Sequence, residues 1–368
     1  MKLRAGEWVE VRSEAEILGS LDASGQLDGL PFMPEMLKFC GQRFKVWKRG
    51  HKTCDTVNKT GGRRMTSAVH LQELRCDGMA HGRCQAGCLL YWKEAWIKPV
   101  SSAVETRSDP ESGPGQISEV DPMGSRAAAE LVAHATKQDG SEKTDPTYVC
   151  QATRLPYVTT LLPWWDVRQY WEDYASGNVR LGRMLSSFVY SSYYNLIQSG
   201  IGLGRPLRWL YDIFQGIRGG IPFPKRVGNI PPGSPTPARA LNLKPGELVR
   251  VRSYKEILST LDNNNRNRGL YFDCEEVPYC GGTYRVKDRV SRIINEGTGK
   301  MMEFKTPSVI LDGVYCQARY SDRRLFCPRS IYPMWREVWL ERVTAEESGA
   351  MRSPTEPLKS GSRRTGCM

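Results

Sequence analysis

The alternation of apolar and polar positions predicts that two parts of the chain begin in the same way. Residues 8–11 and residues 248–251 each form a period-two run after a Gly-containing turn, which is typical of a strand with one buried face. A serine and a short stretch with helical spacing follow each run. We therefore expect short helices over residues 13–21 and 253–261, each with its serine as the N-cap.

These similar starts belong to an internal duplication. Residues 3–22 (LRAGEWVEVRSEAEILGSLD) match residues 243–262 (LKPGELVRVRSYKEILSTLD), and the offset of 240 residues continues without gaps well beyond them. The second copy then gains three residues, so that residues 92–96 match residues 335–339. A self-match of this extent predicts two homologous domains of about a hundred residues each.

Within each copy, short apolar runs are separated by Gly, Asn and Pro, which favours a small β-barrel. The segment PGELVRV at residues 245–251 resembles the first strand of SH3-like and KOW-type barrels. This resemblance implies two homologous small SH3-like β-barrel domains. Together with the helical pattern between the copies, the expected fold class is mainly β with an α-helical insert.

Changes in composition suggest the domain boundaries. A stretch rich in Ser, Gly, Pro, Glu and Ala has few aromatic residues and predicts a flexible linker, with a short helix over residues 127–136. The expected parts are a first SH3-like domain with a metal cluster (1–100), this linker (101–147), an aromatic-rich helical segment (148–224), a Pro-rich linker (225–242), a second, degenerate SH3-like domain (243–343) and a disordered tail (344–368).

The middle segment predicts helices over residues 164–174, 179–198 and 206–217, and these carry many aromatic side chains. One interpretation is a helical hairpin packed on the barrels. The alternative is a peripheral membrane contact through residues 163–218, in which arginines face acidic headgroups. The candidate anionic-surface contacts are Arg180, Arg183, Arg205, Arg208 and Arg218.

The charge balance is 52 Lys+Arg against 40 Asp+Glu, a formal net charge of +12. This favours an anionic partner such as nucleic acid, acidic lipid or acidic polysaccharide, although basic loops that only aid solubility give the same total. The N-terminal residues do not have the pattern of a signal peptide, and no apolar run is long enough to predict a transmembrane segment. We therefore expect a cytoplasmic protein whose clustered cysteines bind metal or carry out redox chemistry.

The candidate chemistry lies between Cys54 and Trp96, a stretch that holds four of the 11 cysteines and two of the 4 histidines. Thiolate and imidazole groups this closely spaced suit a borderline-soft metal ion, although buried free thiols or a redox pair are the alternative. The candidate metal ligands are Cys54, His70, Cys76, Cys84 and Cys88, with His81 as a neighbouring group or alternative ligand.

The second copy provides an internal control, because three candidate ligands of the first copy are isoleucines in the second. The aligned pairs are Cys54 with Ile294, His70 with Ile310, and Cys88 with Ile331. Our interpretation is that these side chains converge on one buried point. A metal would hold that point in the first copy, and a hydrophobic plug would fill it in the second.

The run from Cys76 to His81 (CDGMAH) resembles the CDGSH iron–sulfur motif, which implies a two-iron cluster. The histidine stands one residue farther along than in that motif, and the upstream Cys-x-Cys is absent. Zinc is therefore the preferred ion, because mixed Cys/His sites in small β domains are usually structural, and iron or an iron–sulfur cluster is the alternative.

No nucleophile elbow and no P-loop occur in the sequence. The overall pattern resembles uncharacterised bacterial duplicated-domain proteins, and this resemblance implies no particular activity. The expected function is a metal-binding scaffold with a structural zinc, whose partner is a protein or an anionic polymer. A metalloenzyme or redox protein using iron at the same cluster is the first alternative, and a nucleic-acid-binding protein is the second.

Overall fold

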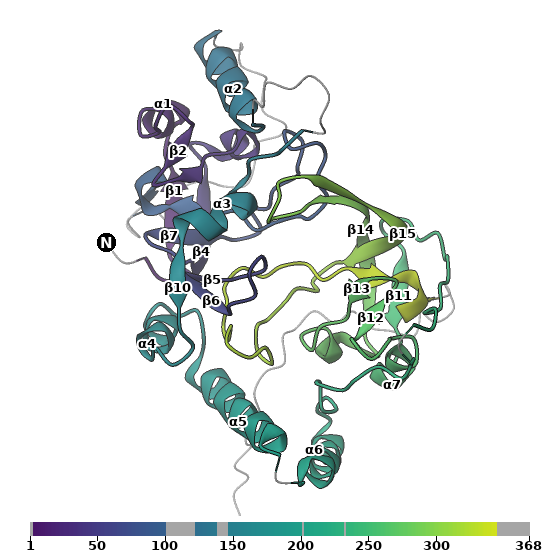
Figure 1. Cartoon of the computed structure of the whole chain (residues 1–368). Coiled ribbons are helices and arrows are strands. Elements are labelled where there is room, and N and C mark those ends of the chain that lie inside the picture. The colour runs from purple at the N-terminus through teal and green to yellow at the C-terminus, as the bar shows by residue number, and fades with distance from the viewer. Residues whose placement is uncertain (1–2, 101–121, 138–145, 201, 232, 344–368) are drawn as a thin grey trace, which may run out of the picture.

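The computed structural model describes residues 3–100, 122–137, 146–200, 202–231 and 233–343. Its two largest sheets are five-stranded and antiparallel, with orders β8-β7-β4-β1-β9 and β16-β15-β14-β11-β17 (Figure 1). The first contains β1 (Trp8–Val11), β4 (Arg43–Arg49), β7 (Ala68–Leu71), β8 (Trp92–Lys93) and β9 (Ile97–Pro99). The second contains β11 (Leu248–Val251), β14 (Thr283–Ile294), β15 (Met301–Leu311), β16 (Trp335–Arg336) and β17 (Leu340–Arg342).

The register of the two sheets follows the internal duplication. Trp8 of β1 pairs with Lys45 of β4, and the residues 240 positions later pair in the same way in β11 and β14. The pair of Val69 and Trp92 likewise recurs in β15 and β16, with the three extra residues between them. We call the two units repeat 1 (residues 3–100) and repeat 2 (residues 243–343).

Neither five-stranded sheet closes into a barrel within the described residues, and the helices make the architecture mixed α/β rather than mainly β. The edge strands β8 and β9 are two and three residues long, and the 3-10 helix η2 (Glu94–Trp96) joins them. This turn sends β9 to the far edge, beside β1. Strands this short leave few backbone groups with which to close a sheet.

The serine-capped helices predicted after the first strands are present but shorter than expected. They are α1 (Glu14–Leu18) and α7 (Tyr254–Leu258), and each begins with a capping box in which a serine and a glutamate cap each other's backbone N–H groups. The remaining small elements recur in both repeats, as expected for a duplication. They are β2 (Gln26–Leu27), β3 (Leu30–Pro31) and η1 (Pro34–Phe39) in repeat 1, and β12 (Arg266–Asn267), β13 (Leu270–Tyr271), η4 (Val277–Tyr279) and η5 (Glu337–Trp339) in repeat 2.

Each repeat has its own aromatic core. In repeat 1, Trp92 and Trp96 are fully buried, and the Phe32 ring meets the Trp96 ring edge to face at 5.3 Å between centroids. In repeat 2, Phe272 meets Trp339 in the same way at 5.2 Å. Each large ring of this kind buries about 150–250 Å² of surface and so contributes strongly to the stability of a domain of this size.

The two repeats differ in their long hairpin. In repeat 2, β14 and β15 form a single ladder from Val286 to Ile294, with register shifts after Val286 and after Val290. In repeat 1 the equivalent hairpin is interrupted, and its outer half is a separate sheet of β5 (Lys52–Cys54), β6 (Gly62–Arg64) and β10 (Thr160–Leu162). The strand β10 comes from the middle segment, so this sheet ties the middle of the chain to repeat 1.

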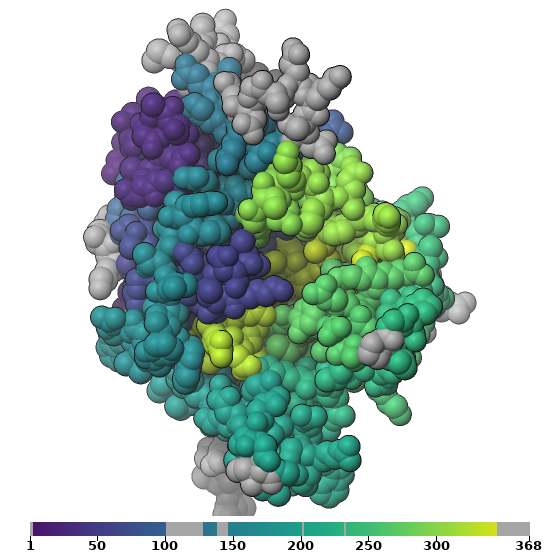
Figure 2. Space-filling view, viewed as in Figure 1, coloured from purple at the N-terminus to yellow at the C-terminus, as the bar shows by residue number. Residues whose placement is uncertain are grey.

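Each hairpin tip packs on the opposite repeat (Figures 1 and 2). The tip of repeat 1 places Cys54 against Ala318 and Cys327 of repeat 2. In the opposite direction, the backbone N–H of Ile294, near the tip of repeat 2, donates to Cys84 Sγ of repeat 1 at 3.4 Å. The loop after β7 and the loop after β15 are therefore each covered by the other repeat.

The middle segment contains α3 (Gln151–Val158), α4 (Arg168–Ala175), α5 (Leu181–Gln198) and α6 (Gly204–Arg218). The last three correspond to the predicted helices, whereas α3 was not predicted. The short helix expected over residues 127–136 is α2 (Pro122–His134). Most of the predicted flexible linker and all of the predicted disordered tail lie outside the described residues. Among the described helices, none is long and apolar enough to cross a membrane.

A buried ion pair joins all three parts of the chain. Lys52 Nζ of repeat 1 lies 2.6 Å from Asp173 Oδ2 of α4 and also donates to the Leu325 carbonyl of repeat 2 at 2.8 Å. Both charged side chains are almost completely buried. A buried pair contributes little by itself, but removing one partner leaves an uncompensated charge in the interior.

We expect Asp173→Asn to lower the free energy of unfolding by about 3–5 kcal/mol, because the Lys52 ammonium would keep its burial and lose its counter-charge. Denaturant unfolding at neutral pH measures the change. The matched control is Glu10→Gln, which breaks exposed pairs with Arg43 and Lys98 and should cost about 0–1 kcal/mol. Equal losses in the two variants would contradict the structural role of the buried pair.

Candidate metal centre

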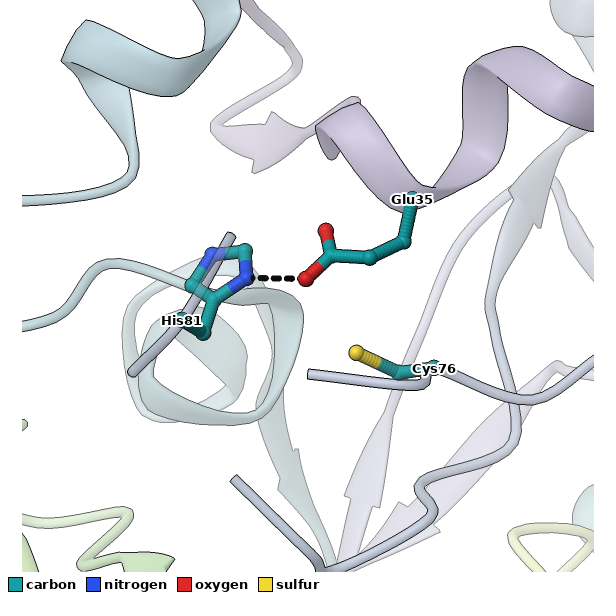
Figure 3. Close-up of side chains that lie close together, drawn as sticks. All are labelled: Glu35, Cys76 and His81. Atoms are coloured by element: carbon teal, nitrogen blue, oxygen red, sulfur yellow. Dashed lines mark hydrogen bonds and ion pairs between the residues drawn. The ribbon is translucent and has the colours of Figure 1, made fainter. Parts of the chain in front are cut away.

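Three potential metal ligands lie together beneath η1. Ligand atoms of Glu35, Cys76 and His81 all lie within 4.8 Å of one another (Figure 3). Glu35 comes from η1, and the other two come from the loop between β7 and β8. A carboxylate, a thiol and an imidazole at this separation are a ligand set that zinc accepts.

The local hydrogen bonds fix this group and leave one oxygen without a partner. His81 Nδ1 lies 2.7 Å from Glu35 Oε1, and His81 Nε2 lies 3.1 Å from the Val149 carbonyl oxygen. The Ala80 N–H also donates to Glu35 Oε1. Glu35 Oε2 is buried and has no hydrogen-bond partner in the structure. A buried carboxylate oxygen of this kind carries a desolvation cost that a cation would offset.

The triad borders a cavity with an unusual concentration of thiols. Cys76, His81, Cys84, Cys88 and Cys150 all line it. The first four belong to the predicted cluster, and Cys150 is the residue that precedes α3. One wall belongs to repeat 2, because Ile294 and Arg329 also line the cavity. The site therefore lies where repeat 1, the middle segment and repeat 2 meet.

Burial keeps these thiols protonated. Desolvation is the main cause that raises the pKa of Cys88 to about 12 and that of Cys150 to about 11, and it also raises the pKa values of Cys76 and Cys84. A metal ion would have to displace these protons, so metal affinity should fall as the pH falls.

Backbone N–H groups act against desolvation and lower the pKa of three of these four thiols. The backbone N–H groups of Gly78, Ala86 and Thr153 lower the pKa of Cys76, Cys84 and Cys150, respectively. Ile294 adds a donor to Cys84 from repeat 2. N–H groups aimed at sulfur stabilise the thiolate form, which is the form that binds metal.

The structure brings together Cys76, Cys84, Cys88 and His81, but it places Cys54 and His70 in other surroundings. Cys54 belongs to the hairpin tip and packs with Ala318 and Cys327 of repeat 2. His70 lies on β7, where Nδ1 is 2.9 Å from the Leu90 carbonyl oxygen and the ring centroid is 4.2 Å from that of Tyr91. The reason for the separation is that the hairpin tip reaches across to the opposite repeat.

The isoleucines of repeat 2 do not form the expected single plug. Ile310 pairs with Asp288 in the β14–β15 ladder, whereas Ile294 pairs with Met301. Asp288 and Ile294 are six residues apart on one strand, which is roughly 20 Å. Ile294 instead lines the cysteine cavity of repeat 1, and Ile331 packs beside Cys54 and Cys327.

Sequence reasoning missed two members of the site, Glu35 and Cys150. Glu35 lies in a helical turn with no other candidate ligand nearby in the sequence, and Cys150 lies 62 residues after Cys88. Only the tertiary packing of η1 and α3 against the loop brings them to the cavity. The one available signal for Cys150 was that it is a cysteine without an assigned role.

Comparison with known proteins gives no relative for this arrangement. No protein-family model, no curated protein and no solved structure matches the chain. The chemistry of the site must therefore be judged from its own geometry.

We expect His70→Asn to reduce the acid sensitivity of the fold without changing the metal content. Burial lowers the pKa of His70 to about 3, so below about pH 6.5 the unfolded chain binds a proton that the folded chain excludes. Stability therefore falls as the pH falls, by up to about 1.4 kcal/mol per pH unit for this histidine. Asparagine keeps a donor for the Leu90 carbonyl but does not titrate.

Denaturant unfolding at several pH values between 7 and 5 measures this slope. His51, whose pKa burial also lowers to about 3, should leave part of the acid sensitivity in the variant. An unchanged slope would contradict the assignment, and loss of metal on this substitution would return His70 to the ligand set.

Proposed function

We propose that this protein is a metal-binding scaffold whose metal centre fastens the two repeats and the middle segment to one another. The observation that carries the proposal is the cavity at their junction. Four thiols and an imidazole line this cavity, and beside it lies a buried carboxylate that has one oxygen without a hydrogen-bond partner. Each open sheet repeats the strand order and the 3-10 turn before its last strand, which is compatible with a pair of SH3-like modules. Such modules commonly act as binding platforms, and that role is the one we propose here.

A metal ion bound in this cavity would stabilise the folded chain. Buried polar groups without partners destabilise a fold, and a cation that binds only the folded chain stabilises it by mass action. Glu35, Cys76 and His81 alone suit zinc, with His81 Nε2 donating to the Val149 carbonyl as metal-bound histidines commonly do. The additional thiols of Cys84, Cys88 and Cys150 keep iron as the alternative.

Elemental analysis of the purified protein tests the proposal. We expect close to one metal centre per chain in the wild type and a loss of most metal in Cys76→Ser, because serine replaces a central thiolate ligand. The matched control is Cys316→Ser, which changes the duplicated counterpart of Cys76 outside the cavity and should leave the metal content unchanged. A metal-free wild type, prepared both with and without oxygen, would overturn the proposal.

A second candidate function, contact with an anionic membrane surface, is favoured by the apolar face of the middle segment. Of the 23 exposed large hydrophobic side chains among the described residues, 17 lie between Tyr157 and Ile217. Soluble monomers rarely leave so many together in contact with water. This concentration is independent of the metal site.

Helix α6 shows the arrangement most clearly. Trp209, Ile213 and Ile217 are spaced four residues apart and are 65%, 40% and 82% exposed, so they form one stripe. On the other side of the helix, Leu207 and Tyr211 pack against the chain. The helix therefore packs one partly buried apolar face against the chain and presents a second one to the surroundings.

The charges around this face suit acidic headgroups. Between residues 181 and 218 the sequence has one acidic residue, Asp212, and it is paired with Arg226. Arg205 and Arg218 are exposed at the two ends of α6. Of the other candidates, Arg180 is exposed, while Arg183 and Arg208 are half-buried, with Arg183 donating to the Gln317 carbonyl oxygen. Exposed tryptophan flanked by arginine is typical of helices that lie in a membrane interface.

Vesicle sedimentation tests this second candidate. We expect binding to vesicles containing phosphatidylserine, weaker binding to phosphatidylcholine alone, and a loss of about tenfold or more in Trp209→Glu, because the interface would have to accept a charge. Trp8→Glu is the matched control, since Trp8 is also an exposed tryptophan but lies on repeat 1. Dimerisation through this face without vesicle binding, or binding of polynucleotide instead, would contradict the membrane assignment.

A further inference from the structure

We infer that the metal centre is an iron–sulfur cluster held by Cys76, Cys84, Cys88 and Cys150, rather than a single zinc ion. This inference rests on the proposed function, because it names the kind of metal centre that the same cavity holds. It replaces the predicted ligand set by one that drops Cys54 and adds Cys150.

The spacing of the sulfurs is the first argument. Four thiolates around one zinc ion would have sulfurs about 3.8 Å apart, given a zinc–sulfur bond of about 2.3 Å and tetrahedral geometry. Among the described residues, no three of the four cysteines have sulfurs that all lie within 4.8 Å of one another. All four nevertheless line one cavity. Thiols that surround a space without meeting suit a cluster, in which each cysteine binds a different corner or edge.

The backbone donors are the second argument. The Ile294 N–H donates to Cys84 Sγ at 3.4 Å, and the backbone N–H groups of Gly78, Ala86 and Thr153 lower the pKa of Cys76, Cys84 and Cys150. Hydrogen bonds to the ligand sulfurs stabilise the negative charge of an iron–sulfur cluster and help to set its reduction potential. The fold provides these donors at three sulfurs from separate segments.

Repeat 2 provides a natural control for this geometry. The Cys76 N–H donates to the Cys88 carbonyl at 2.9 Å, and the Cys316 N–H donates to the Ile331 carbonyl at 2.8 Å, so the two loops have the same local fold. A second backbone bond is also repeated, from the Arg83 N–H to the Gly78 carbonyl at 2.9 Å and from the Phe326 N–H to the Ala318 carbonyl at 2.8 Å. The backbone of the two sites is thus alike.

The side chains around the two loops differ, although the backbones of the loops are alike. In repeat 2, Ile331 occupies the position that corresponds to Cys88. The hairpin tip that packs on the repeat 2 loop contributes Cys54, whereas the tip that packs on the repeat 1 loop contributes Ile294. Ile331 and Cys54 pack against Cys327 and Ala318 in a small hydrophobic cluster. The loop of repeat 1 contributes three thiols to a cavity, to which the middle segment adds Cys150, whereas the loop of repeat 2 packs against Cys54 and Ile331. The additional ligands and the space for a cluster therefore occur together.

The surroundings hold a buried cation, Arg329, that suits a negative cluster, and a buried carboxylate, Glu35, that lies beside Cys76. Arg329 lines the cavity, is 3% exposed as a side chain, and forms an ion pair with Glu296. An iron–sulfur centre with four thiolate ligands carries net negative charge, and a buried guanidinium beside it would stabilise that charge. His81 and Glu35, which already share a hydrogen bond, lie beside Cys76 and are left outside the ligand set.

The test is to purify the full chain without oxygen and to measure iron, acid-labile sulfide and the visible spectrum. We expect a brown protein with about two or four iron atoms per chain and an equal amount of sulfide. We also expect bleaching on exposure to a chelator with an oxidant, and an electron paramagnetic resonance signal in the reduced or the oxidised state. These measurements on the wild type do not depend on whether any variant folds.

Ligand variants then separate this set from the one based on sequence alone. Cys150→Ser should lose at least half of the iron and sulfide and change the spectrum, while Cys54→Ser should keep both. A colourless protein with stoichiometric zinc would overturn the cluster and leave the proposed metal scaffold standing. A protein without any metal would overturn both. Iron lost in Cys54→Ser but kept in a folded Cys150→Ser would overturn the ligand assignment.

Discussion

The structure depends on the packing of the hairpin tip of each repeat on the other repeat. Each tip covers the loop that follows the third strand of the opposite sheet, with Cys54 on one side and Ile294 on the other. Neither loop has regular secondary structure of its own that could bury its thiols. Packing by the other repeat therefore shields both loops partly from water, and it lowers the dielectric constant around their cysteines.

This arrangement explains why charged residues are buried at the junction. The pair of Lys52 and Asp173 links the outer hairpin of repeat 1 to α4, and Arg329 with Glu296 links the loop of repeat 2 to its own hairpin tip. Buried pairs contribute less to stability than apolar contacts of the same size, but they tolerate few alternative geometries. They are well suited to fixing how the repeats are placed around the cavity.

The two repeats show how one fold can carry two different interiors. Their sheets keep the same strand order and register, and their loops keep the same backbone hydrogen bonds. The difference lies in a few side chains, with cysteine at residue 88 and isoleucine at residue 331. A change from a thiol that can bind metal to a branched apolar side chain removes a ligand and fills space at once. Among the described residues, neither repeat has a counterpart to the many exposed aromatic and aliphatic side chains of α4–α6, which give the molecule a second surface of distinct chemistry.

The sequence by itself determined the duplication, the first strands with their serine-capped helices, three of the four helices of the middle segment, and the stretch that contains most of the cysteine cavity. These features depend on local spacing or on self-similarity, and both can be read along the chain. Three thiols and His81 of the site lie within thirteen consecutive residues, from Cys76 to Cys88, so their proximity was predictable.

The tertiary structure alone decided that Glu35 and Cys150 join them and that Cys54 and His70 do not. It also decided that the sheets stay open. The edge strands are too short to close a sheet, and their length depends on the turn beside them. The physical reason is the same in each case. The direction in which a hairpin tip or a short helix packs is set by contacts with residues far away in the chain, and no local pattern encodes those contacts.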